Sequence, residues 1–131
     1  MSSRTWRRGG LVLVGLVLVG LVVRTPGRGS IKNESPYPLW VVETDSGRAI
    51  AHKLAPGYAS PAHVDADGVR SVDGAPIRGH KSWWKVRDMS SATVRATDGA
   101  LDIRCLVCSE VQDDEFGSVR FDDSNGWGEP L

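Results

Sequence analysis

Residues 38–57 read PLWVVETDSGRAIAHKLAPG and predict a β-hairpin. An apolar run from Leu39 to Val42 precedes a turn at Asp45-Ser46-Gly47, and a second run extends from Ala49 to Leu54. The following Pro56-Gly57 suits a type II turn, in which proline takes the second position and glycine the third. Two short strands joined by a tight turn are therefore expected near the start of the ordered part of the chain.

Similar short apolar runs separated by turn residues follow this hairpin, and no helical period is evident after Val23. They read VRSV, HKSWWKVRD, ATVRAT and ALDIRCLV, and lie at residues 69–72, 80–88, 92–97 and 100–107. A further edge strand is predicted between Ser118 and Phe121. Five or six short strands at roughly even spacing predict an all-β domain, either a small antiparallel sandwich or a barrel.

The N-terminal part of the chain contains an apolar helix candidate, LVLVGLVLVGLVV, with Leu11 at its start, Val17 at its centre and Val23 at its end. A membrane-spanning helix needs about 20 residues, whereas the apolar core of a secretory signal needs about 7–15. The length favours a signal peptide behind the basic residues Arg7 and Arg8. The segment is therefore predicted to direct export or to anchor the chain in a membrane.

Two interpretations of this segment stay open. A cleavage site would require small residues after the apolar run, and the best candidate, Gly27-Arg28-Gly29, is preceded unfavourably by Arg24 and Pro26. Flanking arginines that reach the interface would instead support a retained signal-anchor in a thin membrane. We favour retention, with residues after Ser30 outside the cytoplasm in either case.

The sequence predicts three parts of the chain, which becomes more acidic toward residue 131. Residues 1–29 hold five arginines and no acid; residues 30–112 are expected to form the β domain; and residues 113–131 form an acidic, glycine-rich tail. The basic residues from Arg24 to Lys32 would favour anionic lipid headgroups. An acidic tail disfavours nucleic acid as a partner, because phosphate contacts need clustered lysine and arginine.

The pair Trp83-Trp84 gives a candidate binding surface. Neighbouring side chains of a strand face opposite ways, so Trp84 is expected in the core, and Trp83 on a basic face together with Lys81, Lys85 and Arg87. An exposed aromatic among cations suits a glycan, a lipid headgroup or a protein partner. The alternative is that Trp83 packs under the loop of residues 56–68 as a second small cluster.

Cys105 and Cys108 are predicted to form a disulfide, because paired cysteines in exported proteins are usually bonded. This bond requires the strand to end in a turn at Leu106-Val107. Free thiols, a metal site or redox chemistry are the alternatives. One CxxC supplies only half of a zinc site, His52, His63 and His80 show no ligand spacing, and no cofactor is predicted.

Two weaker motifs carry little functional weight. Asp65-Ala-Asp67-Gly68 resembles a calcium loop, but the twelfth position falls on Gly74, where a glutamate is needed, so a turn explains it better. Asn33-Glu34-Ser35 satisfies the N-glycosylation pattern.

No catalytic motif is found, and the sequence therefore predicts a non-catalytic module, membrane-anchored or exported, with a structural or binding role. Envelope proteins, virion membrane components and immunity-type factors share this organisation. The predicted partners are the lipid bilayer, through the N-terminal segment, and a protein or glycan. The alternative function is an exported thiol/disulfide or zinc-binding protein that uses Cys105 and Cys108.

Overall fold

The computed structural model describes residues 29–78, 82–87, 90–112 and 114–131. The predicted N-terminal helix, with Leu11, Val17 and Val23, and the predicted site residue Lys81 lie outside these ranges. The described part of the chain has no helix with the length and hydrophobicity that crossing a membrane requires.

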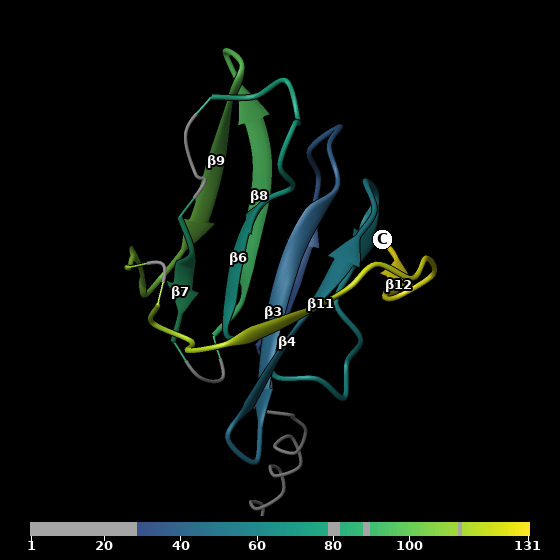
Figure 1. Cartoon of the computed structure of the whole chain (residues 1–131). Helices are drawn as coiled ribbons and strands as arrows, with labels where there is room; N and C mark the ends of the chain where they lie inside the picture. The colour runs from purple at the N-terminus through teal and green to yellow at the C-terminus, as the bar shows by residue number, and fades with distance from the viewer. Residues whose placement is uncertain (1–28, 79–81, 88–89, 113) are drawn as a thin grey trace, which may run out of the picture.

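The described residues form an all-β sandwich of two mixed sheets (Figure 1). The six-stranded sheet has the order β10-β7-β6-β3-β4-β11, and the five-stranded sheet the order β12-β5-β2-β8-β9. The strands are β2 (Ile31–Asn33), β3 (Leu39–Asp45), β4 (Arg48–Leu54), β5 (Tyr58–Ala59), β6 (Gly68–Ser71), β7 (Trp84–Val86), β8 (Ala92–Thr97), β9 (Ala100–Cys105), β10 (Cys108–Glu110), β11 (Val119–Asp122) and β12 (Glu129–Pro130).

The predicted hairpin is confirmed as β3 and β4, which pair antiparallel from Leu39↔Leu54 to Asp45↔Arg48. Ser46 and Gly47 connect them with φ values of 52° and 79°, the left-handed pair that a two-residue hairpin turn needs. The runs predicted at 69–72, 92–97 and 100–107 correspond to β6, β8 and β9.

The prediction of a purely antiparallel sheet is wrong, because each sheet contains a parallel pair. β11 runs parallel to β4, and β2 runs parallel to β8. β2 and β8 are far apart in sequence, and the chain between them crosses to the other sheet and returns twice, through β3–β4 and then through β6–β7. β11 reaches its place only after the chain has crossed the outer face of the six-stranded sheet (Figure 1).

The main core lies between the two sheets. β2 and β8 contribute Ile31 and Val94 from the five-stranded sheet, and Leu39, Val41 and Val69 face them from the six-stranded sheet; all five side chains are fully buried. Burying a side chain of this size contributes about 1.5–3 kcal/mol of transfer free energy. The inner faces of both sheets therefore provide most of the packing.

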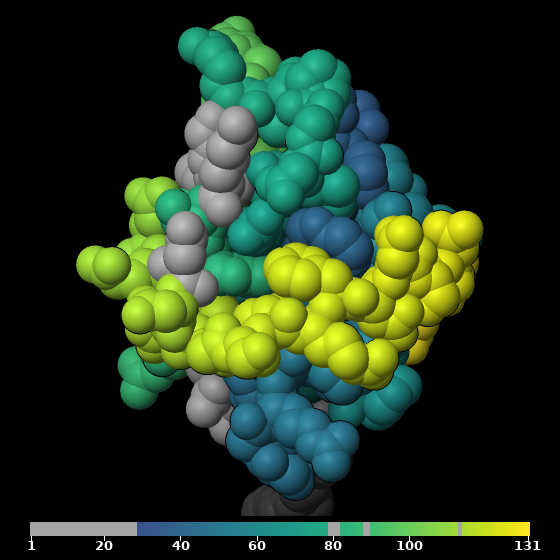
Figure 2. All heavy atoms as spheres, viewed as in Figure 1, coloured from purple at the N-terminus to yellow at the C-terminus, as the bar shows by residue number. Residues whose placement is uncertain are grey.

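A second cluster covers the outer face of the six-stranded sheet. Trp40 and Val42 of β3 point to this side, where Trp83 joins them. Phe116 and Val119 pack over the cluster from residues 114–131, named here the C-terminal strap. Figure 2 shows the strap as a lime and yellow band across this face. The run LWVV of β3 is apolar on both sides because both faces of the strand are covered.

The strap is part of both sheets, although the sequence predicted a separate tail from residue 113. β11 forms one edge of the six-stranded sheet, and β12 forms the edge of the five-stranded sheet on the same side. On the opposite side, β9 and β10 form the two other edges, and the turn between them carries the disulfide. The chain thus passes from one sheet to the other at each side of the sandwich.

Candidate functional site

Trp83 is buried, so its predicted place on an exposed basic face is wrong. It is only 2% exposed, and its ring packs edge-on against Phe116, with centroids 5.7 Å apart. Phe121 stacks at 6.3 Å, and the guanidinium of Arg70 lies 5.4 Å from the Trp83 ring centroid and 5.6 Å from that of Phe121.

The predicted alternation along this strand nevertheless holds. Val86 is buried in the main core, where the half-buried Trp84 also packs, and Trp83 faces the other way. The alternative interpretation, in which Trp83 packs in a second small cluster, is confirmed. Its cover, however, is the C-terminal strap and not the loop of residues 56–68, because Phe116 and Phe121 occupy the outer face.

Lys85 and Arg87 are exposed and line a groove of about 860 Å³ beside the covered Trp83. Its walls come from the end of the β3–β4 hairpin, from β7, from the turn before β10 and from the start of the strap. The groove is lined by Thr44, Gly47, Arg48, Asp67, Lys85, Arg87, Val107, Cys108, Ser109, Glu115 and Phe116. With Asp67, which lies just before β6, five segments of the chain thus meet at one surface.

The two acids of the groove have partners. The carboxylate of Asp67 accepts hydrogen bonds from the Thr44 amide at 2.8 Å and the Thr44 hydroxyl at 2.7 Å. Glu115 pairs with Lys85 at 2.9 Å. Within the described residues no ion pair or side-chain hydrogen bond involves Arg48 or Arg87, so two guanidinium groups remain available for an anionic ligand.

Cys105 and Cys108 form the predicted disulfide, with Cα atoms 6.0 Å apart. The strand ends before the predicted turn at Leu106-Val107, and we call residues 105–108 the disulfide turn. Leu106 is 97% exposed and Val107 is 47% exposed. The covalent loop therefore presents two exposed apolar side chains, of which Val107 also lines the groove.

A second group of titratable residues lies where the strap meets the hairpin. His52 contacts the Glu43 carboxylate through Nε2 at 2.8 Å, and its Nδ1 is 4.0 Å from Asp122. The ring stacks on Trp127 at 4.4 Å with an interplanar angle of 5°. No hydroxyl or thiol of the described residues hydrogen-bonds to this ring, so its contacts fit a structural role.

The pKa of Asp122 is lowered from its usual value of 3.8. The main causes are the hydrogen bonds that Ser124 donates from its hydroxyl, at 2.5 Å, and from its backbone amide, at 3.0 Å. The charges of His52 and Arg120 lower it further. These bonds fix the chain where it leaves β11.

The glycosylation pattern at Asn33-Glu34-Ser35 falls on a buried asparagine. The amide of Asn33 donates to the carbonyl oxygens of Tyr37 and Leu54, at 2.8 and 3.1 Å, and its own oxygen accepts from the Ser35 hydroxyl at 2.7 Å. A glycan on this nitrogen would disrupt the donated bonds. The motif therefore has a structural role in the folded domain.

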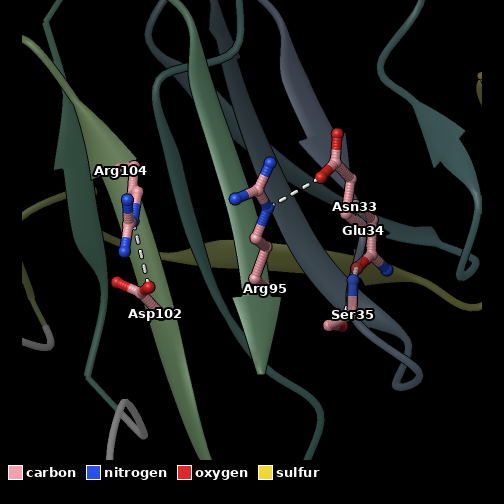
Figure 3. Close-up of polar contacts among 6 residues, drawn as sticks. All are labelled: Asn33, Glu34, Ser35, Arg95, Asp102 and Arg104. Atoms are coloured by element: carbon pink, nitrogen blue, oxygen red, sulfur yellow. Dashed lines mark hydrogen bonds and ion pairs between the residues drawn. The ribbon is translucent and has the colours of Figure 1, made fainter. Parts of the chain in front are cut away.

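The outer face of the five-stranded sheet carries ion pairs (Figure 3). Glu34 next to Asn33 pairs with Arg95 at 2.8 Å, and Asp102 pairs with Arg104 at 3.0 Å. Exposed pairs of this kind contribute about 0–1 kcal/mol each. This face is polar, in contrast to the strap-covered face opposite.

The calcium-like motif has structural partners as well. Asp65 accepts a hydrogen bond from the Gly29 amide at 3.0 Å, and Asp67 is used by Thr44. The described residues contain no group of three or more His, Cys, Asp or Glu side chains that could hold a metal ion.

Sequence reasoning missed Arg48, which closes the hairpin side of the groove, and the aromatic residues of the strap. Phe116, Phe121 and Trp127 are spaced five or six residues apart within an acidic segment. Aromatic residues recurring in an otherwise polar tail were the available signal that the tail packs on the domain.

Comparison with known proteins finds no matching family model, and neither curated proteins nor solved structures give a match.

Proposed function

We propose that the protein is a non-catalytic β-sandwich, held at or exported across a membrane by its N-terminal segment, which binds a partner bearing anionic groups. The observation that carries the proposal is the disulfide turn, which presents Leu106 and Val107 beside a groove lined by Arg48 and Arg87. Disulfides persist mainly in oxidising compartments, in agreement with export.

The chemistry of the groove favours binding over turnover. Arginine forms paired hydrogen bonds with carboxylate or phosphate oxygens, and Arg48 and Arg87 line the same groove. The carboxylates nearby are held by Thr44 and Lys85, which leaves no free general base among the described groove residues.

The proposal is tested by cell fractionation followed by N-terminal sequencing of the mature protein. We expect the chain in the membrane fraction after a salt wash, with residues 11–23 retained. A mature protein that begins near Ser30 would show that the segment is cleaved and the domain released. Membrane anchoring would then be wrong, and export of the domain would stand.

The alternative, a thiol/disulfide or zinc-binding protein, is favoured by one observation: the disulfide turn is partly exposed. However, the described residues after the CxxC contain no helix that would lower a thiol pKa, and the nearby segment is acidic. Mass spectrometry before and after reduction distinguishes the two: a zinc adduct, or rapid alkylation at neutral pH, would favour the alternative.

A further inference from the structure

The point at which the chain enters the sandwich lies close to the disulfide turn. Gly29 packs so tightly on Ser90 that a Cβ atom at position 29 would overlap the Ser90 carbonyl. The Ser90 amide donates to the carbonyl of Arg87 at 3.0 Å, and the Arg87 amide donates to the carbonyl of Val107 at 3.1 Å. Three successive contacts therefore connect the entry point to the disulfide turn. We call its two exposed side chains, Leu106 and Val107, the apolar tip.

The linker to the predicted membrane segment is short. Only residues 24–28 separate Val23 from Gly29, and an extended chain spans at most about 3.3–3.6 Å per residue. If residues 11–23 are in the bilayer, Gly29 lies within roughly 20 Å of the membrane. In that arrangement the end of the sandwich with the disulfide turn would be the one nearest the bilayer, because the β8–β9 turn lies at the opposite end of β9.

The surface presented at this end has the chemistry of a membrane-binding tip. Leu106 and Val107 project from a covalently closed turn, so their exposure needs no rearrangement. Arg48 and Arg87 line the groove together with Val107, and neither arginine has a side-chain partner among the described residues. Apolar side chains enter the headgroup region favourably, and arginines beside them contact lipid phosphates.

We propose that this end of the domain docks on an anionic bilayer, with Leu106 and Val107 inserted among the headgroups and Arg48 and Arg87 bound to lipid phosphates. The inference rests on the proposed membrane anchoring and names the lipid headgroup as the anionic partner of the groove. The domain is then held against the membrane and does not rotate freely about its linker.

The test uses the full chain in lipid nanodiscs that contain a gadolinium-chelating headgroup lipid, with Leu and Val methyl groups labelled for NMR. In discs of phosphatidylcholine with phosphatidylglycerol, we expect the Leu106 methyl signals to broaden several-fold more than those of Leu131. Leu131 is the matched control, because it is also exposed, at 58%, but belongs to the strap end near β12.

Charge variants test the phosphate contacts. The double variant Arg48→Gln/Arg87→Gln should reduce the broadening of Leu106 to the value in discs of phosphatidylcholine alone. The control variant Arg78→Gln/Arg95→Gln removes the same amount of charge away from the groove. Arg78 lies beside the β8–β9 turn and Arg95 lies on β8, so this variant should leave the broadening of Leu106 unchanged.

Three outcomes overturn the inference. If the chain is in the disc but Leu106 broadens no more than Leu131, the docking is wrong while the anchoring stands. If the chain elutes free of the discs, the proposed anchoring fails as well. If the Leu106 methyl signals are not broadened by the lipid but change chemical shift when a glutamate-rich peptide is added, the groove is assigned to an acidic protein segment.

Discussion

At the scale of single residues, Trp83 is the side chain on which the C-terminal strap packs at the outer face of the six-stranded sheet. Trp84 next to it packs in the main core, whereas the Trp83 ring is enclosed by Phe116, Phe121 and the guanidinium of Arg70. Arg70 also pairs with Asp73 at 3.0 Å, while its buried Nε has no hydrogen-bond partner among the described residues. The cation is therefore held both by the two rings and by the Asp73 carboxylate.

Trp83→Ala should lower the free energy of unfolding by about 3–5 kcal/mol, because it opens a large cavity under the strap. Chemical denaturation of the full chain measures the change. The control is Leu106→Ala, a change at a side chain that is 97% exposed, which should stay within about 0.5 kcal/mol of the wild type. An equal loss of unfolding free energy in the two variants would contradict the assignment of Trp83 to a packed cluster and of Leu106 to the exposed turn.

Asp122→Asn should lower the melting temperature at neutral pH and have a smaller effect in acid. The folded-state pKa of Asp122 is lowered below 3.8, so its carboxylate adds stability above that pH and loses the contribution as the pH falls through the folded-state value. Melting of both proteins at about pH 7 and about pH 3, on either side of the usual carboxyl pKa, checks this. A difference of the same size at both values would show that the charge is not responsible.

At the scale of elements, the strap is the feature that the sequence pattern did not reveal. β11 pairs with β4 through four register positions, from Val119↔Ala49 to Asp122↔His52, and β12 pairs with β5 through two. Lys53 pairs with Asp123 at 2.8 Å just beyond β11. Acidic residues that looked solvated in the sequence thus alternate with residues that dock on the sheets.

The attachment of β12 depends on Gly128. Its φ is 110°, and a Cβ atom there would lie 2.7 Å from the carbonyl oxygen of Ala59 and 2.8 Å from a Leu54 methyl. Gly128→Ala should therefore release β12 from β5 and lower the melting temperature, with a change in Trp127 fluorescence.

Gly126→Ala is the matched control for this prediction. Gly126 has a φ of 89°, but no described atom lies within 4 Å of the position that a Cβ would take there. Only backbone strain of about 1–2 kcal/mol is therefore expected. If Gly126→Ala destabilises as much as Gly128→Ala, the close approach to Ala59 is not what matters.

At the scale of the whole molecule, the sandwich is joined at both sides by the chain itself. One side is closed by the disulfide turn between β9 and β10, and the other by residues 123–128 between β11 and β12. The apolar tip and the groove arginines belong to the first side, so the same covalent link that joins the sheets also positions the proposed membrane contact.

Replacing both cysteines, in Cys105→Ser/Cys108→Ser, should cost about 2 kcal/mol, the chain-entropy estimate for a loop this short. Denaturation of the oxidised wild type, the reduced wild type and the variant measures it, and the last two should agree. A variant as stable as the oxidised protein would show that the bond does not constrain the turn.

Much of the fold followed from local patterns, and the parts that did not follow share a cause. The β3–β4 hairpin, β8, β9 and the turn at Leu106-Val107 depend on alternation and turn residues within a few positions. β2 and β12 have only three and two residues, and their pairing partners lie distant in sequence. A pattern confined to a short window cannot indicate such pairings.

The candidate site shows the same division. Lys85, Arg87 and the disulfide were expected from the sequence, and the structure places them at one groove. Arg48 was not expected there, because only the packing of the hairpin beside the neighbouring strands brings it to the groove. The exposure of Trp83 was misjudged, because alternation assigns a side chain to a face and not to solvent.

The sequence by itself determined the β class, the central hairpin, the cysteine pair and the apolar N-terminal segment, because these depend on residues close together along the chain. Only the tertiary structure decided which face of the larger sheet is covered, that Asn33 is buried, and that Gly29 is connected through Ser90 and Arg87 to Val107. Those features are set by contacts between segments distant in sequence, which form only when the sheets pack and the strap crosses them.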